Sequence, residues 1–383
     1  MTRTPPPLRW WEYVTRKNKF VQKILNRLLE RGIFVEIMKL LIVAKNHKAS
    51  DLHLNVGTKP KIRKNGSLID VEETYNLTSE DVESMACSIL SDNNKSILLS
   101  SGDVDFAYDM DGFRLRVNIS KERQGFFIAI RILSKEIPTL EGLNMPKVIN
   151  QLASLKRGLV LITGATGSGK STTLAAIVDY INTTRKEHII TIEDPIEYIH
   201  THKNCIVSQR EVGRDAGSFE KALKSSLRQD PDIILLGEMR DLQTTQAALT
   251  AAETGHLVFS TLHTNGAIDS INRIIDIFPH EAKEQVKSQL SSTLQGVVTQ
   301  RLVKKEDNSG RVAALEIMIV NQGIKNLIRE GKSHQINQVI QTNISAGMQG
   351  MDYHLAQLHK SRTISLLEAN SNCSNPDTLK HLL

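Results

Sequence analysis

The stretch Gly164-Ala-Thr-Gly-Ser-Gly-Lys-Ser171 decides the fold of this 383-residue chain. It follows an apolar run of strand length, Leu159-Val-Leu-Ile-Thr163, and precedes a stretch of helical character. Glycines in such a loop let backbone N–H groups converge on phosphate oxygens that side chains would obstruct. The sequence therefore predicts a P-loop, which binds nucleotide phosphates at the amino end of a helix.

The residues of this loop have distinct expected roles. Lys170 is expected to reach the β- and γ-phosphates of ATP, and the Ser171 hydroxyl to coordinate Mg²⁺. The other expected nucleotide-binding residues are Gly164, Ala165, Thr166, Gly167, Ser168, Gly169 and Thr172. A chance match to this pattern is on the order of 1% for a chain of this length, so a glycine-rich turn without nucleotide is the weaker interpretation.

Further apolar runs of strand length follow the loop, separated by helical stretches. They are His188-Ile-Ile-Thr-Ile192, Ile233-Ile-Leu-Leu236 and Leu257-Val-Phe-Ser-Thr261. Continuous apolar strands that alternate with helices predict a parallel sheet covered on both faces. In such a sheet ligands bind at the carboxyl ends of the strands, which is where the P-loop begins.

Acidic residues stand at two of these strand ends. Glu238 follows the run 233–236, where it is placed to orient or deprotonate the attacking water. In Thr191-Ile-Glu-Asp-Pro-Ile-Glu197, Glu193 and Asp194 are expected to hold Mg²⁺, partly through water, and Glu193 to act in catalysis. Carboxylates beside a triphosphate repel it unless a metal or an arginine intervenes. Solvated carboxylates at strand ends are the alternative.

Histidines and arginines supply further candidates for catalysis. His256 and His263 flank the last apolar run, one at each end, and one of them is a candidate γ-phosphate sensor; a structural histidine is the alternative. Arg114, Arg116 and Arg131 stand on predicted strands nearer the N-terminus and are candidates for neutralising charge in the transition state. A solvated sheet face would explain the arginines equally well.

The chain divides into four predicted parts. Residues 1–37 form a basic extension, interpreted as an amphipathic helix on its own domain or on a membrane surface, or as the result of a start site placed upstream of Met38. Residues 38–138 form a small α/β domain, 139–143 a linker, and 144–383 the nucleotide-binding domain with a helical C-terminal region. Predicted elements of the small domain are helices 38–47 and 79–90, with Ser79 as N-cap, and strands 51–55, 61–63, 113–119 and 126–132.

Composition argues against two classes of protein. The extension carries a net charge of +5 and the whole chain +6, so the rest of the chain is nearly neutral. Aromatic residues make up 4% of the sequence. Charge and aromatic content therefore give no general electrostatic argument for a nucleic-acid partner. No apolar run reaches the roughly 18 residues that a membrane span requires. Three scattered cysteines predict neither a disulfide framework nor a metal cluster, as expected for a cytoplasmic protein.

In order and spacing, these motifs resemble those of the type II/IV secretion-superfamily ATPases. The stretches 164–171, 191–197, 233–241 and 256–265 resemble the family's Walker A, Asp box, Walker B and His box, and 49–54 resembles the start of its PAS-like domain. The resemblance implies an α/β chain with an N-terminal PAS-like domain and a C-terminal RecA-like P-loop ATPase domain. It also implies a homohexamer, with ATP and Mg²⁺ as cofactors.

The same resemblance assigns roles to individual residues. Glu238 is the implied catalytic carboxylate, Glu193 the Asp-box acid, and His256 and His263 the His-box pair. The three arginines of the small domain become candidates to close over the phosphates.

One C-terminal stretch points to a branch of the family. Gly323-Ile-Lys-Asn-Leu-Ile-Arg-Glu330 is similar to a motif of the motors that retract type IV pili, and the tetracysteine insert of assembly motors is missing. The resemblance implies that hydrolysis powers pilus retraction and twitching motility from the inner face of the cell membrane, through an inner-membrane platform protein. The residues expected to couple hydrolysis to this partner are Asn326, Leu327, Ile328, Arg329 and Glu330. Alternatives are another motor of the family, serving assembly or conjugation-like secretion, and a nucleic-acid-handling RecA-like ATPase.

Overall fold

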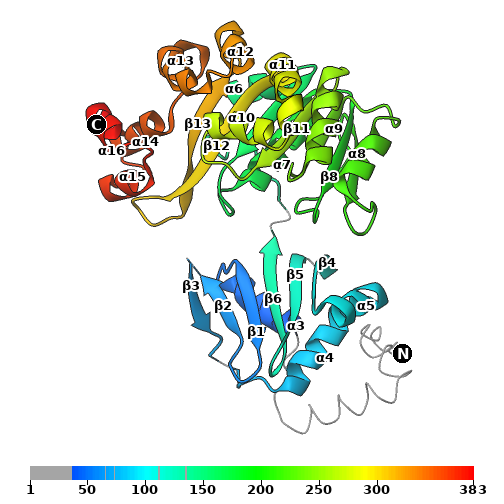
Figure 1. The fold of residues 1–383 in the computed structure, drawn as a ribbon. Helices are drawn as coiled ribbons and strands as arrows, with labels where there is room; N and C mark the ends of the chain where they lie inside the picture. The colour runs from blue at the N-terminus through cyan, green and yellow to red at the C-terminus, as the bar shows by residue number, and fades with distance from the viewer. Residues whose placement is uncertain (1–36, 65, 73, 111–112, 134–135) are drawn as a thin grey trace, which may run out of the picture. The chain divides into compact units, whose positions relative to one another are not determined.

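The computed structural model describes residues 37–64, 66–72, 74–110, 113–133 and 136–383 (Figure 1). They form two compact units, which divide between residues 134 and 135. The predicted basic extension lies outside the described residues except for Ile37. Within the described ranges, no helix has both the length and the apolar character that crossing a membrane would need.

In its described residues, the first unit consists of a six-stranded antiparallel sheet and three helices. Its strand order is β3-β2-β1-β6-β5-β4. The strands are β1 (Asp51–Asn55), β2 (Lys61–Lys64), β3 (Ser67–Asp70), β4 (Asp103–Met110), β5 (Phe113–Glu122) and β6 (Gly125–Leu133), and the helices are α3 (Ile37–Asn46), α4 (Ser79–Ile89) and α5 (Asp92–Ser101). Alternating apolar residues of the strands and one face of each helix bury a common core, as the period-2 and period-3.6 patterns require.

The start of α4 corrects one detail of the sequence interpretation. Thr78, rather than Ser79, is the N-cap: its hydroxyl accepts from the Asp81 N–H at 3.2 Å, and the Thr78 N–H donates to the Asp81 carboxylate at 2.8 Å. Such a reciprocal capping box requires an acid three residues after the cap, a spacing that Thr78 and Asp81 have.

The second unit contains a seven-stranded sheet of order β13-β12-β7-β11-β10-β8-β9. All neighbours are parallel except β12 and β13. The strands are β7 (Gly158–Thr163), β8 (His188–Glu193), β9 (Ile206–Glu211), β10 (Ile233–Leu236), β11 (Leu257–Leu262), β12 (Leu294–Lys304) and β13 (Arg311–Ile319). The four apolar runs predicted as strands are β7, β8, β10 and β11, and the sequence interpretation missed β9, β12 and β13.

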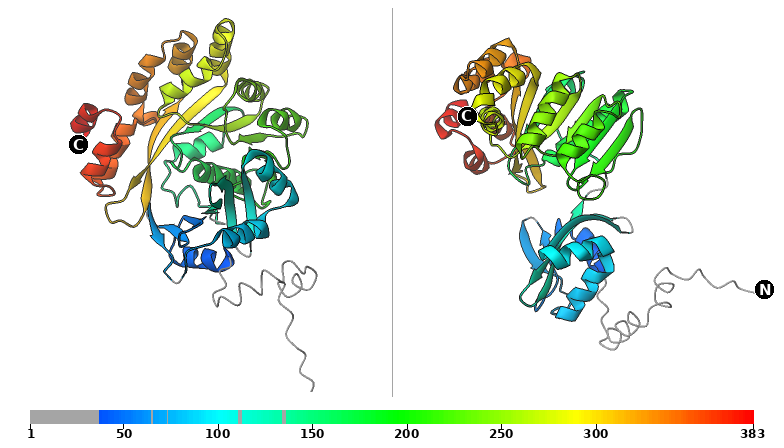
Figure 2. Two further views of the ribbon diagram at one scale, coloured as in Figure 1. Left: turned by 60° about the horizontal axis from the view of Figure 1, so that its bottom comes forward. Right: turned by 45° about the vertical axis from the view of Figure 1, so that its right-hand side comes forward.

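Helices cover both faces of this sheet (Figure 2). They are α6 (Val148–Ala153), α7 (Lys170–Thr184), α8 (Phe219–Ser226), α9 (Leu242–Glu253), α10 (Ala267–Asp276), α11 (Lys283–Thr293), α12 (Gln322–Arg329), α13 (Ile336–Thr342), α14 (Met351–Lys360), α15 (Leu366–Asn372) and α16 (Pro376–Leu382). Along β7, Leu159 and Leu161 pack with α8 to α13, whereas Val160 and Ile162 pack with α6 and α7. Burial on both faces explains why these strands are continuously apolar.

The last three helices pack against the hairpin of β12 and β13. Val303 of β12 and Ala314 of β13 share a buried cluster with Leu355 and Leu379. Arg301 of β12 adds polar contacts, because its guanidinium donates to the Asn372 backbone oxygen and to Ser374 Oγ. The C-terminal helices are thereby fixed to β12.

Candidate nucleotide site

The predicted P-loop connects β7 to α7, at the carboxyl edge of the parallel sheet. Gly164 and Gly169 have φ of 139° and 88°, in the region that side chains avoid. A Cβ on Gly164 would collide with the backbone oxygen of Gln300 on the neighbouring strand β12. The loop therefore follows a path that only glycine permits at these positions, and its backbone is available to phosphate oxygens as the fit to a nucleotide requires.

Lys170 begins α7 and is 8% exposed. Its ammonium donates to the backbone oxygens of Gly164 at 2.8 Å and Ala165 at 2.9 Å, so the charge lies over the loop. Burial lowers the pKa of Lys170, while the nearby carboxylates of Glu238 and Glu197 oppose that shift. The positive group and the amino end of α7 face the same loop, which suits the binding of a polyphosphate.

Glu238 stands next to this loop because its backbone is held between two strands. The Gly237 N–H donates to the Ile192 oxygen at 2.8 Å, and the Met239 N–H donates to the Thr261 oxygen at 3.2 Å. The Glu238 side chain is 12% exposed and lies 2.6 Å from Arg240 Nε. A carboxylate shielded from water at a strand end beside a P-loop has the placement expected of a general base.

His263 joins Glu238 to the P-loop. Its Nε2 lies 3.5 Å from Glu238 Oε2, and its Nδ1 lies 3.5 Å from Thr166 Oγ1. Three separate segments, the P-loop and the ends of β10 and β11, are therefore brought together as the sequence analysis expected.

Glu193, at the end of β8, is held by two donors. Thr191 Oγ1 donates to its carboxylate at 2.7 Å and Gln209 Nε2 at 3.3 Å. Burial raises the pKa of Glu193 to about 7, although both hydrogen bonds act to lower it. A partly buried carboxylate with a raised pKa at a strand end is a typical feature of a functional site.

The acidic segment that follows Glu193, residues 194–203, is attached to α7 near the P-loop. The Tyr198 hydroxyl lies 3.1 Å from Thr172 Oγ1 in the first turn of α7. Gln209 of β9 donates to the Tyr198 backbone oxygen at 2.9 Å as well as to Glu193. Tyr198 and Gln209 were not among the residues singled out from the sequence, although Tyr198 directly follows the acidic stretch.

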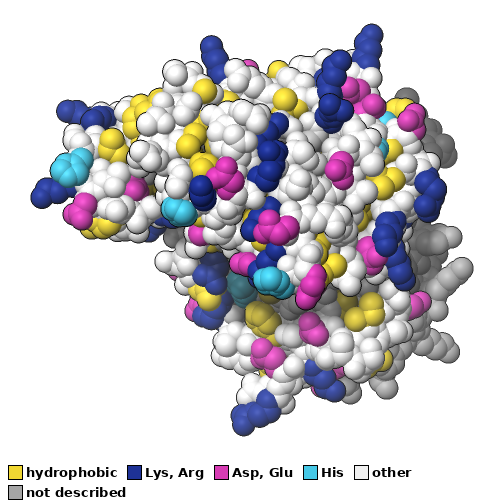
Figure 3. All heavy atoms as spheres, turned by 45° about the horizontal axis from the view of Figure 1, so that its top comes forward, with side chains coloured by type: hydrophobic (Ala, Val, Ile, Leu, Met, Phe, Trp, Pro, Cys, Tyr) yellow, Lys and Arg dark blue, Asp and Glu magenta, His cyan; other side chains and the backbone are white. Residues whose placement is uncertain are grey.

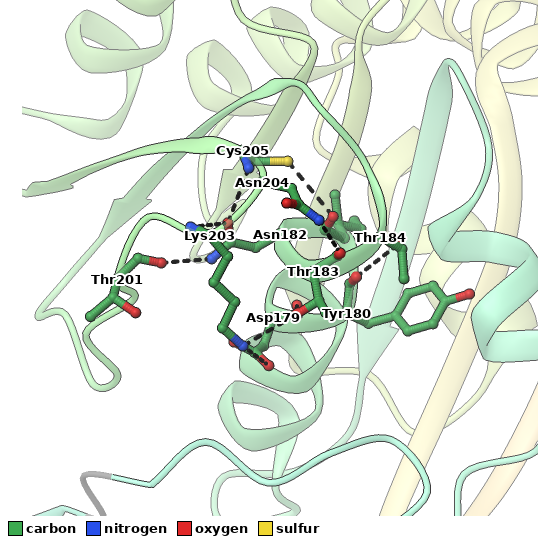
Figure 4. Close-up of polar contacts among 10 residues, drawn as sticks. Asp179, Tyr180, Asn182, Thr183, Thr184, Thr201, Lys203, Asn204 and Cys205 are labelled. Atoms are coloured by element: carbon green, nitrogen blue, oxygen red, sulfur yellow. Dashed lines mark hydrogen bonds and ion pairs between the residues drawn. The ribbon is translucent and has the colours of Figure 1, made fainter.

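The far end of the same segment is also anchored to α7 (Figure 4). Asn182 is fully buried; its Nδ2 donates to the Thr201 oxygen at 2.7 Å, and its Oδ1 accepts from the Lys203 N–H at 3.1 Å. Lys203 Nζ lies 2.7 Å from Asp179 of the same helix. Both ends of the acidic segment are thus fixed to the helix that begins with Lys170.

The described residues offer a limited set of ligands for Mg²⁺. Ser171 is exposed at the start of α7, and Glu193 and Asp194 stand at the end of β8. Within the described ranges, no three His, Cys, Asp or Glu side chains form a cluster that could hold a metal by themselves. Mg²⁺ commonly takes one or two protein ligands and completes its shell with phosphate oxygens and water, so this donor set fits the ion.

His256 is not brought to this site. It precedes β11, at the amino end of the parallel sheet, and its Nδ1 lies 2.9 Å from the Ala251 oxygen. The P-loop is at the carboxyl end, so the two histidines lie at opposite ends of a six-residue strand. The placement of His256 corrects its expected catalytic role, because its contacts are those of a structural histidine.

The three candidate arginines belong to the first unit and bind carboxylates there. Their ion pairs are Arg114–Asp109 at 2.6 Å, Arg116–Asp105 at 2.7 Å and Arg131–Asp51 at 3.0 Å. Each of these guanidinium groups therefore already forms an ion pair with an aspartate of its own unit. Contact of these arginines with a nucleotide stays a prediction.

The stretch predicted to couple hydrolysis to a partner forms α12 and its end. Asn326, Arg329 and Glu330 are exposed, and Leu327 is partly buried against the core. Ile328 is only 1% exposed and belongs to that core. Its side chain faces inward at the helical spacing from Ile324, so it is not available for direct contact with a partner, and its part in coupling stays a prediction.

Comparisons with known proteins agree with this geometry. The family described as "Type II/IV secretion system protein" matches residues 31–361. The chain is 46% identical over 344 residues to the type IV pilus retractation ATPase PilT of Pseudomonas aeruginosa, covering 90% of this chain and 99% of that one. It is 38% identical over 350 residues to the type IV pilus ATPase PilU of the same bacterium, covering 91% of each.

A solved structure is similar over the same extent. The crystal structure of the pilus retraction motor PilT with bound ADP has a TM-score of 0.83 and 46% identity, covering 91% of this chain and all of that one. Similarity over nearly the whole of both chains, together with the P-loop geometry, shows that this chain belongs to the type II/IV secretion system family, as a P-loop ATPase.

Proposed function

We propose that this chain is an ATP-hydrolysing motor that powers the retraction of type IV pili. The observation that carries the proposal is the 46% identity to PilT over almost the full length of both chains. The exposed residues Asn326, Arg329 and Glu330 of the C-terminal motif support the same branch of the family, because they are available to a partner.

Each residue of the site has a proposed part in hydrolysis. Lys170 and the backbone of 164–169 bind the phosphates, and Ser171, Glu193 and Asp194 hold Mg²⁺ directly or through water. Bound Mg²⁺ would neutralise phosphate charge. Glu238 orients the attacking water and accepts its proton, and His263 keeps the Glu238 carboxylate close to the P-loop.

The proposed working form is a homohexamer at the inner face of the cell membrane. The arginines of the first unit would neutralise charge at a nucleotide, and closing and opening of the two units during turnover would move an inner-membrane platform protein.

A deletion strain tests the proposal most directly. We expect cells without the protein to carry excess surface pili and to lose twitching motility. Complementation with Lys170→Ala should fail, whereas Lys186→Ala, which changes an exposed lysine beyond the end of α7, should restore motility. Cells without any pili would instead indicate an assembly motor, and unchanged motility would contradict both functions.

The alternative of a nucleic-acid motor finds no support on the face drawn in Figure 3. Basic and acidic side chains alternate there rather than gather into one basic field. A nucleic-acid track needs clustered Lys and Arg with aromatic residues between them. Stimulation of ATP hydrolysis by added DNA would nevertheless favour that alternative over pilus retraction.

A further inference from the structure

We infer that Gln300, on strand β12, is a positioning residue that sets the conformation of the phosphate-binding loop. Gln300 is 136 residues beyond Gly164 in the sequence, and it follows Thr299, which pairs with Thr163 at the end of β7. The inference rests on the proposed binding of nucleotide by this loop.

The Gln300 side chain joins the loop to the helix that follows it. Gln300 is 2% exposed. Its Nε2 donates to the Ser168 backbone oxygen at 2.7 Å, and its Oε1 accepts from Thr173 Oγ1 at 2.8 Å. One amide therefore fixes both the end of the loop and the first turn of α7, in a place where water does not compete.

The bond to Ser168 determines where the next N–H group points. The peptide bond is planar and trans, so the C=O of Ser168 and the N–H of Gly169 point in opposite directions. Because the C=O points to Gln300, the Gly169 N–H points away from β12. Gln300 thus orients one of the backbone donors that a P-loop directs at phosphate.

The backbone of the loop passes close to Gln300 at two glycines, Gly164 and Gly169. A Cβ on Gly164 would collide with the Gln300 backbone oxygen, and a Cβ on Gly169 would lie 2.8 Å from Gln300 Nε2. Real Cβ atoms do not approach a neighbour that closely. The contact at Gly164 involves the backbone of β12, and the contact at Gly169 involves the Gln300 amide itself, so the loop packs closely against β12 at both glycines.

Only a side chain with a donor and an acceptor can make both contacts. Glutamine supplies both in one plane, whereas glutamate lacks the donor and adds negative charge, and methionine has a similar length with neither strong donor nor acceptor. We therefore expect Gln300→Met to release the loop and Gln300→Glu to release it while also repelling the phosphates.

The experiment compares nucleotide affinity with stability in the purified full-length protein. Gln300→Met is expected to raise the Kd for Mg-ADP and the KM for ATP by about ten-fold, and to change kcat by less than about three-fold, because Glu238 keeps its contacts. Thr173→Val, which removes only one of the two bonds, should raise the Kd by about three-fold.

Thr299→Val is the matched control. Thr299 is fully buried on the same strand, and its hydroxyl lies 2.9 Å from Thr163 Oγ1. Its loss should lower the melting temperature as Gln300→Met does, but change the Kd by less than about two-fold.

The possible results distinguish failure of the inference about Gln300 from failure of the proposed function. If the wild type binds Mg-ADP and neither Gln300→Met nor Thr173→Val weakens binding, or if Thr299→Val weakens it equally, Gln300 has only a structural role and the inference is overturned. If Gln300→Met does not fold, Thr173→Val and Gln300→Glu decide in the same way. Failure of the wild type itself to bind Mg-ADP would overturn the proposed function.

Discussion

The imidazole of His263 lies 3.5 Å from the carboxylate of Glu238. This contact joins the ends of two neighbouring strands, and the other ring nitrogen reaches Thr166 of the P-loop. A distance of 3.5 Å is longer than a good hydrogen bond, and such contacts in active sites commonly shorten when the substrate binds. The pair is therefore arranged to respond to occupation of the P-loop.

Glu238→Gln should separate binding from hydrolysis. The amide keeps the size of the side chain but cannot accept a proton from water, so we expect kcat to fall by at least about 100-fold. The Kd for Mg-ATP should change by less than about three-fold, since Lys170 and the loop backbone are unaltered. Phosphate release and nucleotide titration measure the two quantities, and a wild-type kcat would remove Glu238 from the mechanism.

The two histidines of the His box should behave differently. His263→Gln is expected to lower kcat by about ten-fold, because the link between Glu238 and the P-loop is lost. His256→Gln is the matched control at the other end of β11, and we expect its kcat to stay within about two-fold of the wild type. Equal losses of kcat in the two variants, measured by steady-state hydrolysis, would contradict the placement described here.

His200 should make the second unit less stable in acid. Burial lowers the pKa of His200 to about 4 from a usual 6.5, and Nδ1 has no hydrogen-bond partner among the described residues. Asp179 acts to raise this pKa and Lys203 to lower it, with smaller effects than burial. The unfolded state therefore binds more protons than the folded state between these values, and the free energy of unfolding falls as the pH falls through that window.

Chemical denaturation at about pH 7 and about pH 5 checks this prediction, since one proton changes the free energy of unfolding by at most about 1.4 kcal/mol per pH unit. His200→Gln should lose less stability than the wild type between the two pH values. An identical loss in both proteins would show that His200 does not titrate as predicted.

Substitutions at two adjacent residues of helix α12 should affect different properties, one the stability of the protein and the other twitching motility. Ile328→Ala creates a cavity in the core and should destabilise the protein by about 2–5 kcal/mol. Arg329→Ala changes an exposed side chain, so ATP hydrolysis should stay within about two-fold of the wild type while twitching motility is lost. Thermal unfolding, hydrolysis and motility assays distinguish the two. Normal motility with Arg329→Ala would argue against a coupling role for this helix.

The local sequence pattern was sufficient to predict those strands of the second unit whose residues are apolar throughout. The strands β7, β8, β10 and β11 were predicted because burial on both faces makes them apolar throughout. Glu238 and Glu193 were singled out because each stands at the carboxyl end of such an apolar run. Gln300 was missed because its importance depends on β12 lying beside β7, and strand order is not visible in a local sequence.

The same limit explains what the sequence did not show about two of the candidate residues. His256 and His263 flank the strand symmetrically in the sequence, but a parallel sheet makes its two ends unequal. Ile328 lies between the partly buried Leu327 and the exposed Arg329, and only the direction in which α12 packs shows that the Ile328 side chain belongs to the core.

Gln300 and its neighbour Arg301 face opposite sides of β12, as successive residues of a strand do. The first side chain contacts the loop that precedes α7, and the second contacts the last residue of α15 and the chain just beyond it. The two attachments are therefore one residue apart on the same strand. The contacts that hold the phosphate-binding loop and those that hold the C-terminal helices consequently share one short stretch of β12, so a substitution that shifts the backbone there would disturb both.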